Sequence, residues 1–156
     1  MITCQFEDRG FAKLRHVTVG TLVVNDKQEI LLVKRTSSHR HGTYTIPGGF
    51  LGRDEDTQSA ALRELKEETG YQGEIVGLFM VNDRPDRPKE DRQNVDFLFA
   101  AKIIGGEPNL NDEVSEIHWF KLDSLPAENE FAFDHRGIIL KYAEHLKHPL
   151  QTPIMG

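Results

Sequence analysis

The residues of this chain best suited to chemistry lie at positions 49–71, which read GFLGRDEDTQSAALRELKEETGY. The second half of that segment contains Glu64, Glu67 and Glu68, and residues three and four apart lie on one face of an α-helix. Three carboxylates on one face repel one another unless a cation lies between them. Hard divalent cations such as Mg²⁺ prefer oxygen ligands and usually share them with substrate phosphates. The segment therefore predicts a metal site for phosphate chemistry.

Acidic helix faces also occur on ordinary protein surfaces, where the carboxylates are simply solvated. Such faces usually carry Lys or Arg four residues after each Glu, because that spacing stabilises the helix. No Lys or Arg follows Glu64, Glu67 or Glu68 at that spacing. The pattern therefore favours a metal site over a solvated face.

A helix over this segment would hold the carboxylates in place. Asp56 or Thr57 can cap its start, and Gly70 falls where a left-handed residue would end it. An apolar stripe of good helix formers lies between them, made of Ala60, Ala61, Leu62 and Leu65. Arg63 can hold the neighbouring carboxylates without competing for a metal, because a guanidinium only donates hydrogen bonds.

These residues resemble the Nudix box, Gly-x5-Glu-x7-Arg-Glu-aliphatic-x-Glu-Glu-x-Gly-aliphatic, of the Nudix hydrolase family. The matching residues are Gly49, Glu55, Arg63, Glu64, Leu65, Glu67, Glu68, Gly70 and Tyr71. Tyr71 departs from the usual Ile, Leu or Val at a position that packs. Gly52 and Asp54 differ from the Glu and Gly often found before the first box Glu, which can alter the turn there. The flanks, residues 16–146, resemble the family more weakly.

The resemblance implies a hydrolase that cleaves a nucleoside diphosphate linked to another group at its pyrophosphate, with Mg²⁺ or Mn²⁺ as cofactor. It implies Glu67 and Glu68 as metal ligands, and Glu64 as either a ligand or the general base. The backbone carbonyl of Gly48 is a further candidate ligand, since a Gly-Gly turn lets the backbone approach an ion.

Other roles that the resemblance implies depend on residues around this cluster. Arg63 would orient the carboxylates, and Glu55 would support them. Some family members use as general base a glutamate in a loop well after the box. The matching acidic loop of this chain favours Glu113 over Asp112 and Glu116, although acids before a strand are often merely solvated.

Candidate substrate-binding residues lie outside the box. Arg40 precedes the Gly-rich turn and Arg84 lies in the long charged loop after the box, so either can grip a phosphate or ribose. Solvated loop charges are the alternative. Phe133 lies near where family members place base-contacting residues, and its ring can stack on a nucleobase or pack at a helix start. His135 is expected to be a surface histidine rather than a catalyst.

Composition bounds the class of protein. A length of 156 residues predicts a single domain, 1–156, and 38% hydrophobic with 28% charged residues suit a soluble globular chain. The net charge of −6 argues against nucleic-acid binding. Cys4 is the single cysteine, which excludes an intramolecular disulfide and a Cys-based zinc site. We find no signal-like or membrane-length apolar run, so a cytoplasmic protein without membrane contact is expected, and a homodimer is compatible with the family.

The hydrophobic pattern predicts alternating strands and helices. A hairpin is expected from strands at 16–24 and 29–35 around the Asn25-Asp26 turn. Further strands are expected at 74–81, 95–104 and 116–120, and a second helix at 134–146 capped by Asp134. Residues from about 148 are expected to form a loose tail. Strands interrupted by single helices suggest an α/β fold, and the resemblance implies an α/β/α sandwich with a mixed β-sheet.

Three functions are compatible with these observations. The first is a Mg²⁺-dependent hydrolase of a nucleoside diphosphate derivative, with ADP-ribose as first candidate. The second is a nucleoside triphosphate pyrophosphohydrolase that cleans the nucleotide pool. The third is a non-catalytic nucleotide sensor on a Nudix scaffold, which ranks last because Glu64, Glu67 and Glu68 are all present.

Overall fold

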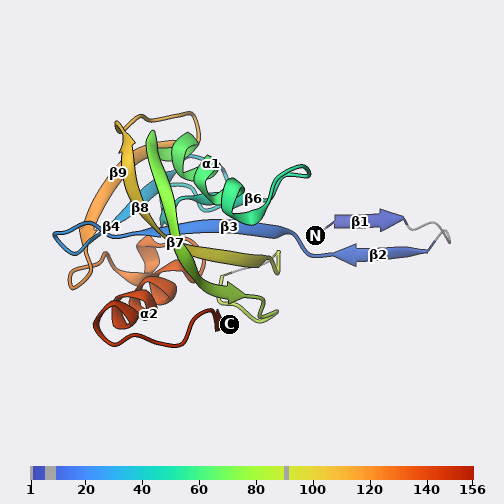
Figure 1. Ribbon diagram of the computed structural model, residues 1–156. Coiled ribbons are helices and arrows are strands. Elements are labelled where there is room, and N and C mark those ends of the chain that lie inside the picture. Colours follow the sequence, from blue (N-terminus) through green and yellow to red (C-terminus); the bar gives the residue numbers. More distant parts are fainter. Residues whose placement is uncertain (1, 6–9, 90–91) are drawn as a thin grey trace.

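The computed structural model describes residues 2–5, 10–89 and 92–156 and shows two α-helices on opposite faces of a mixed sheet (Figure 1). The strands of that sheet, in spatial order, are β10 (Ile154–Met155), β7 (Tyr71–Asn82), β8 (Val95–Gly106), β3 (Val17–Val23) and β6 (Gly48–Phe50). The β10–β7 and β8–β3 pairs are parallel, and the other two pairs are antiparallel. The predicted α/β fold with a mixed sheet is therefore confirmed.

A second, antiparallel sheet contains β5 (Tyr44–Thr45), β4 (Glu29–Arg35) and β9 (Val114–Lys121). The turn between β3 and β4 lies where the sequence predicts it, because the Asn25 side chain accepts hydrogen bonds from the backbone of Lys27 and Glu29. The hairpin itself is shorter than expected. The two strands pair at the Val24–Ile30 bridge and then diverge into different sheets.

The alternation of side chains along the central strands explains why both faces are covered. On β3, Val19 and Val23 pack with residues of α1 (Thr57–Thr69), whereas Leu22 packs with residues of α2 (His135–Lys147). On β8, Leu98 and Phe99 alternate in the same way. Because successive side chains of a strand point to opposite faces, each strand contributes to two cores.

The boundaries of α1 agree with those expected from its caps. The Asp56 carboxylate accepts a hydrogen bond from the backbone N–H of Ser59 at 2.8 Å. Gly70 is left-handed with φ of 78°, and its N–H donates to the Lys66 carbonyl at 2.8 Å. Both ends of the helix are therefore fixed, and this fixes the direction of the glutamates between them.

The chain end corrects one prediction. Instead of a loose tail from about 148, Ile154–Met155 pairs in parallel with Met80 and Val81 of β7, and the Gly156 N–H donates to the Val81 carbonyl. The tail thereby supplies hydrogen-bond partners to an edge strand whose backbone groups would otherwise face solvent. Sequence patterns miss such pairing because two residues are too few to show periodicity.

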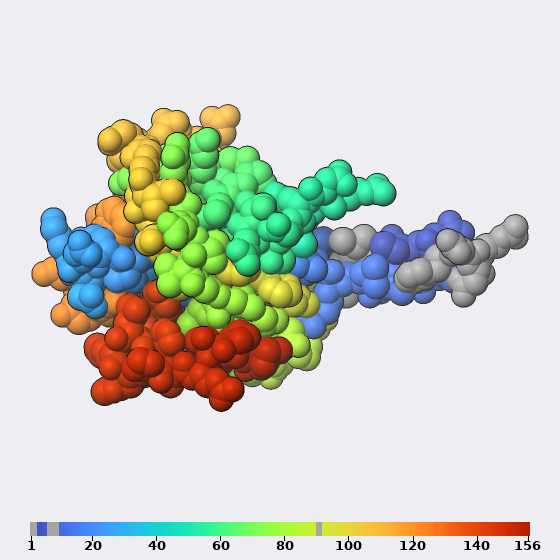
Figure 2. Space-filling model, in the orientation of Figure 1, coloured from blue at the N-terminus to red at the C-terminus, as the bar shows by residue number. Residues whose placement is uncertain are grey.

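Two further segments complete the described chain. A hairpin of β1 (Ile2–Gln5) and β2 (Phe11–Leu14), which the sequence did not predict, extends away from the body in Figures 1 and 2. A short 3₁₀ helix, η1 (Glu128–Glu130), precedes α2. In the described parts of the chain, no helix is long and apolar enough to cross a membrane. The homodimer stays a prediction.

Candidate active site

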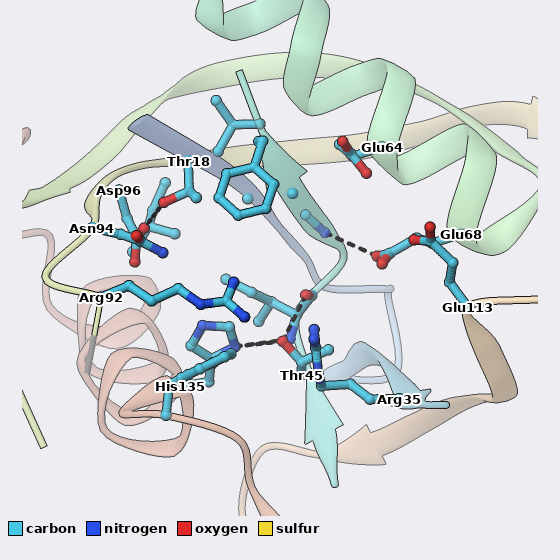
Figure 3. A pocket seen from close by; sticks show the side chains of 18 residues that line it. Thr18, Arg35, Thr45, Glu64, Glu68, Arg92, Asn94, Asp96, Glu113 and His135 are labelled. Carbon is cyan, nitrogen blue, oxygen red and sulfur yellow. Dashed lines mark hydrogen bonds between the residues drawn. The ribbon is translucent and has the colours of Figure 1, made fainter. Parts of the chain in front are cut away.

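A cavity of about 290 Å³ lies where α1, β6, β8 and the start of α2 meet (Figure 3). Its α1 side carries Glu64 and Glu68, and Glu113 from the loop before β9 lies beside them. Its other side carries Arg35 and Arg92. The cavity therefore joins a cluster of carboxylates to a pair of cations that are far apart in the sequence.

Glu68 is the most deeply buried carboxylate of the cavity. Glu68 is only 5% exposed, and its Oε2 accepts a hydrogen bond from the Gly48 N–H at 2.9 Å. Burial raises the pKa of Glu68 to about 8, although the bond from Gly48 opposes the shift. Without a cation beside it, this carboxyl is therefore held largely protonated at neutral pH.

Glu64 lies one helical turn before Glu68 and is packed against the Gly-Gly turn. A Cβ at Gly49 would lie 2.5 Å from the Glu64 carboxylate, so a larger residue there would displace it. Burial raises the pKa of Glu64, against the stabilising contact with Arg63. The surroundings of Glu64 and Glu68 thus both disfavour the charged form of the carboxyl.

Arg63 holds the acidic residues of the box together, in the arrangement expected from the sequence. Its guanidinium lies 2.7 Å from Glu55 Oε1, 2.8 Å from Glu64 Oε1 and 3.0 Å from Glu67 Oε2. Hydrogen bonds from Arg63, and one from the Gly52 N–H, lower the pKa of Glu55. This network fixes carboxylate positions through charged hydrogen bonds.

Glu67 differs from its two neighbours. Its side chain is 55% exposed, is paired with Arg63 and does not line the cavity. Glu67 therefore does not share the cavity with Glu64 and Glu68 in this structure, and its role as a metal ligand stays a prediction. The presence of glycine at position 52, which departs from the usual box pattern, has a local explanation. A Cβ there would lie 2.6 Å from Glu55 Oε1.

Arg40 and Arg84 are not among the cations of the cavity. Arg40 donates to the Lys89 carbonyl at 2.7 Å, and Arg84 pairs with Asp86 at 3.1 Å. Neither lines the cavity, so their part in substrate binding stays a prediction.

Arg35 and Arg92 line the cavity instead. Arg35 is fixed by hydrogen bonds to the His39 carbonyl and to Ser37 Oγ, and its guanidinium lies 5.6 Å from the centre of the Phe133 ring. Burial lowers the pKa of Arg35, although Glu68 opposes the shift. One sequence signal could have indicated Arg35. It lies at the end of a buried strand, and the sheet fixes the direction of a side chain there.

Arg87 binds other parts of the fold together and does not line the cavity. It is buried and bonds the carboxylates of Asp96 at 2.6 Å and Asp134 at 2.8 Å. Asn82 donates to the same Asp134 carboxylate at 3.0 Å. The sequence predicts that the Asp134 side chain caps α2. This is wrong, because Arg87 and Asn82 occupy both oxygens of its carboxylate. The cluster ties the loop after β7 to the sheet and to α2.

Phe133 and His135 lie together at the cation side of the cavity. Their rings are 5.4 Å apart and both line the cavity. The expectation of a surface histidine is therefore wrong, because the turn before α2 directs the ring inward. Burial, with the nearby cations Arg87 and Arg35, lowers the pKa of His135 to about 4, against the effect of Asp134. The ring is neutral at physiological pH.

The cavity sets carboxylates opposite cations on an α/β scaffold, and residues 14–142 match the NUDIX domain family. The chain belongs to the Nudix hydrolases, enzymes that act on pyrophosphate bonds. It is 35% identical over 120 residues to an ADP-ribose pyrophosphatase of Methanocaldococcus jannaschii, covering 77% of this chain and 69% of that protein. It is 34% identical over 106 residues to a Bacillus subtilis protein provisionally named an 8-oxo-dGTP diphosphatase, covering 67% and 66%.

Solved structures agree with this assignment. A NUDIX hydrolase from Nitrosomonas europaea superposes with a TM-score of 0.79 at 27% identity, covering 95% of this chain and 81% of that one. A bifunctional NMN adenylyltransferase/ADP ribose pyrophosphatase from Francisella tularensis, complexed with AMP and manganese, gives 0.63 at 25% identity, covering 86% and 42%. The first of these supports the fold along nearly the whole chain.

The oxygen donors of the cavity fit a hard divalent cation. Glu64 and Glu68 face the same space, and burial without a cation disfavours the charge of both. In the described ranges, no group of three or more His, Cys, Asp or Glu side chains converges closely enough to hold a metal ion. Mg²⁺ commonly takes only one or two carboxylates and completes its shell with water and substrate phosphate. The site therefore suits an ion shared between protein and substrate.

Proposed function

We propose that this chain is a divalent-metal-dependent pyrophosphohydrolase of nucleoside diphosphates linked to another moiety, with ADP-ribose as first candidate substrate. The observation that carries the proposal is the single cavity that sets Glu64 and Glu68 opposite Arg35 and Arg92. Cationic side chains and a bound metal ion can together neutralise the charge of a diphosphate. The 35% identity to an ADP-ribose pyrophosphatase supports the choice of substrate.

Glu68 and Glu64 would hold Mg²⁺ or Mn²⁺, with the Gly48 carbonyl and Glu67 as further candidate ligands. A bound divalent cation neutralises phosphate charge and lowers the pKa of water. The Gly48 N–H donates to Glu68 at 2.9 Å, which holds the Gly-Gly turn next to this carboxylate. The manganese in the Francisella tularensis structure supports a divalent ion here.

The remaining work falls to the side chains of this chain. Arg35 and Arg92 would bind the phosphate oxygens and orient the bond to be cleaved, since positioning and electrostatics dominate phosphoryl-transfer catalysis. Either Glu64 or Glu113 would take the proton of the attacking water, because both carboxyls line the cavity. Arg63 would keep Glu64 in place through its 2.8 Å contact.

The proposal is tested by product identification. Purified protein, Mg²⁺ and ADP-ribose should yield AMP and ribose 5-phosphate in equal amounts, and the reaction should stop when the metal is chelated. Glu68→Gln, prepared in parallel, controls for a contaminating hydrolase. Intact ADP-ribose, together with ready cleavage of other diphosphate derivatives, would remove ADP-ribose from the proposal.

A second candidate, nucleoside triphosphate pyrophosphohydrolysis, is favoured by the 34% identity to the Bacillus subtilis protein. That reaction gives a nucleoside monophosphate and inorganic pyrophosphate. A coupled pyrophosphate assay across the nucleoside triphosphates, including oxidised guanine nucleotides, therefore separates it from ADP-ribose hydrolysis. Pyrophosphate release at rates above those for ADP-ribose would favour this second activity.

A further inference from the structure

The Nδ1 atom of His135 is contacted by two residues from the strand region before the Gly-Gly turn. The Ile46 N–H donates to Nδ1 at 3.3 Å, and Thr45 Oγ1 lies 2.7 Å from the same atom. A ring nitrogen that accepts a backbone N–H carries no proton, so the single proton of the neutral ring lies on Nε2. The Thr45 hydroxyl has a single proton and also lies 3.1 Å from the Ile46 carbonyl, so it shares that proton between this oxygen and Nδ1.

The protonated nitrogen is the one that faces the cavity. Figure 3 shows the ring inside the cavity with its Nδ1 edge turned toward Thr45. Within the described part of the chain, Nε2 of His135 has no hydrogen-bond partner. The ring therefore presents one uncharged donor, in a fixed direction, to whatever enters.

A buried acceptor without a partner, among the described residues, belongs to another residue that lines this cavity. Asn94 lines the cavity, is 7% exposed, and its Oδ1 is buried without a hydrogen-bond partner among the described residues. Its backbone carbonyl accepts hydrogen bonds from Arg15 and Arg87, which fix the main chain at this residue. A buried acceptor that is left unpaired costs free energy, which a ligand group can recover.

We propose that His135 Nε2 and Asn94 Oδ1 form a neutral recognition site for the nucleoside of the substrate. Nε2–H would donate to an uncharged acceptor on the ribose or base, and Oδ1 would accept from a hydroxyl or amino group. The inference rests on the proposed function, which places the diphosphate between the box carboxylates and Arg35. Sites with fixed, desolvated polar groups strongly reject analogues that lack the matching atom.

Equilibrium binding of AMP to the Mg²⁺-loaded protein tests this, because AMP is a product and is not turned over. His135→Phe keeps a ring but loses the donor, and we expect about three- to tenfold weaker AMP binding, the range for one neutral hydrogen bond. Asn94→Leu should weaken AMP binding to a similar extent. Inorganic pyrophosphate should bind all three proteins equally.

Ligand analogues locate the contact. 2′-Deoxy-AMP and 7-deaza-AMP each lack one acceptor, and the analogue that binds wild type weakly but His135→Phe no worse identifies the atom that Nε2–H contacts. His135→Gln, which retains a donor, should recover part of the affinity. ¹⁵N spectra of the histidine rings should show a neutral Nε2–H tautomer at pH 7, independently of any ligand.

Several results would overturn the inference. These are unchanged AMP affinity in both variants, an equal loss of pyrophosphate affinity, an Nδ1–H or charged ring in the spectra, and no AMP binding by wild type. None of these depends on turnover. Failure of ADP-ribose hydrolysis alone would therefore reject the proposed substrate and leave the binding result to decide the nucleoside site.

Discussion

Replacing Glu68 with Gln should make the metal-free protein more stable while nearly abolishing its activity. Gln keeps the shape of the side chain and can still accept the 2.9 Å hydrogen bond from Gly48. It removes a charge that burial disfavours and that only a cation compensates. The opposite signs of the two effects distinguish a metal ligand from a residue that merely packs.

The size of the stability effect follows from the pKa of Glu68. The difference between the ordinary 4.5 and about 8 corresponds to ~5 kcal/mol above pH 8 and ~3 kcal/mol at pH 7, at ~1.36 kcal/mol per pH unit. These are upper limits, because water and side-chain movement relieve part of the cost of a buried charge. In wild type, the contribution of protonated Glu68 to the free energy of unfolding is fully present below pH 4.5. It is lost as the pH rises to about 8, since the folded state binds the proton more tightly than the unfolded state.

Urea unfolding of both proteins in EDTA, from pH 5 to pH 9, measures this difference. We expect Glu68→Gln to be more stable by about 2 kcal/mol or more at pH 8, and to differ by less than about 1 kcal/mol at pH 5. Adding Mg²⁺ should stabilise wild type and have little effect on the variant. Turnover of the variant should fall about a hundredfold or more, as when a group that stabilises transition-state charge is removed.

Two results would refute this reasoning. If the difference in free energy of unfolding between the two proteins were constant from pH 5 to pH 9, the pKa of Glu68 would not be raised by burial. Near-normal turnover with retained metal stabilisation would show that other carboxylates hold the ion. Gln58, an exposed residue of the same helix, offers a matched surface control, since Gln58→Glu adds a charge outside the cavity.

Other substitutions test the rest of the site. Arg35→Gln should raise KM for ADP-ribose about tenfold through loss of a charged hydrogen bond, whereas Arg40→Gln, whose guanidinium bonds the backbone outside the cavity, should change it less. Glu113→Gln should lower kcat about a hundredfold if it is the general base, and Glu116→Gln, which breaks an exposed pair with a lysine, should not. Arg87→Met should destabilise the fold by about 3 kcal/mol or more in urea unfolding, because it leaves two carboxylates without their buried partner. Equal KM values for the two arginine variants would contradict the first expectation. An active Glu113→Gln enzyme would contradict the second, and an unchanged unfolding midpoint of Arg87→Met would contradict the third.

The helix that carries the box could be predicted from sequence because its signals are local. Asp56 and Gly70 fix its ends, and the network of Arg63 with Glu55 and Glu64 forms within ten residues of chain. Capping, helical spacing and opposite charge act over one or two turns, so the residue types alone specify them. The main strands were predictable for the same reason, since their apolar runs are long.

The substrate side of the cavity could not be predicted in this way. Arg35, Asn94 and His135 come from a strand end, a loop and a helix start that meet only in the folded chain. Each looks like an ordinary surface residue in its own neighbourhood, and Arg87 is buried although it lies in a charged loop. Their directions are set by long-range contacts such as the Arg87–Asp134 pair, which no local pattern records.

The same distinction explains why Glu67 and Glu68 differ although they are adjacent and identical in type. The sequence places both on the box helix, and only the tertiary approach of Gly48 to the helix buries one of them. Burial raises the pKa of Glu68, whereas Glu67 remains exposed beside Arg63. The helix therefore supplies acidic side chains, and the Gly-Gly turn selects the one whose charge requires a cation. A larger residue at Gly48 would meet the Val19 carbonyl at 2.2 Å, so moving that turn should weaken metal binding without changing any carboxylate.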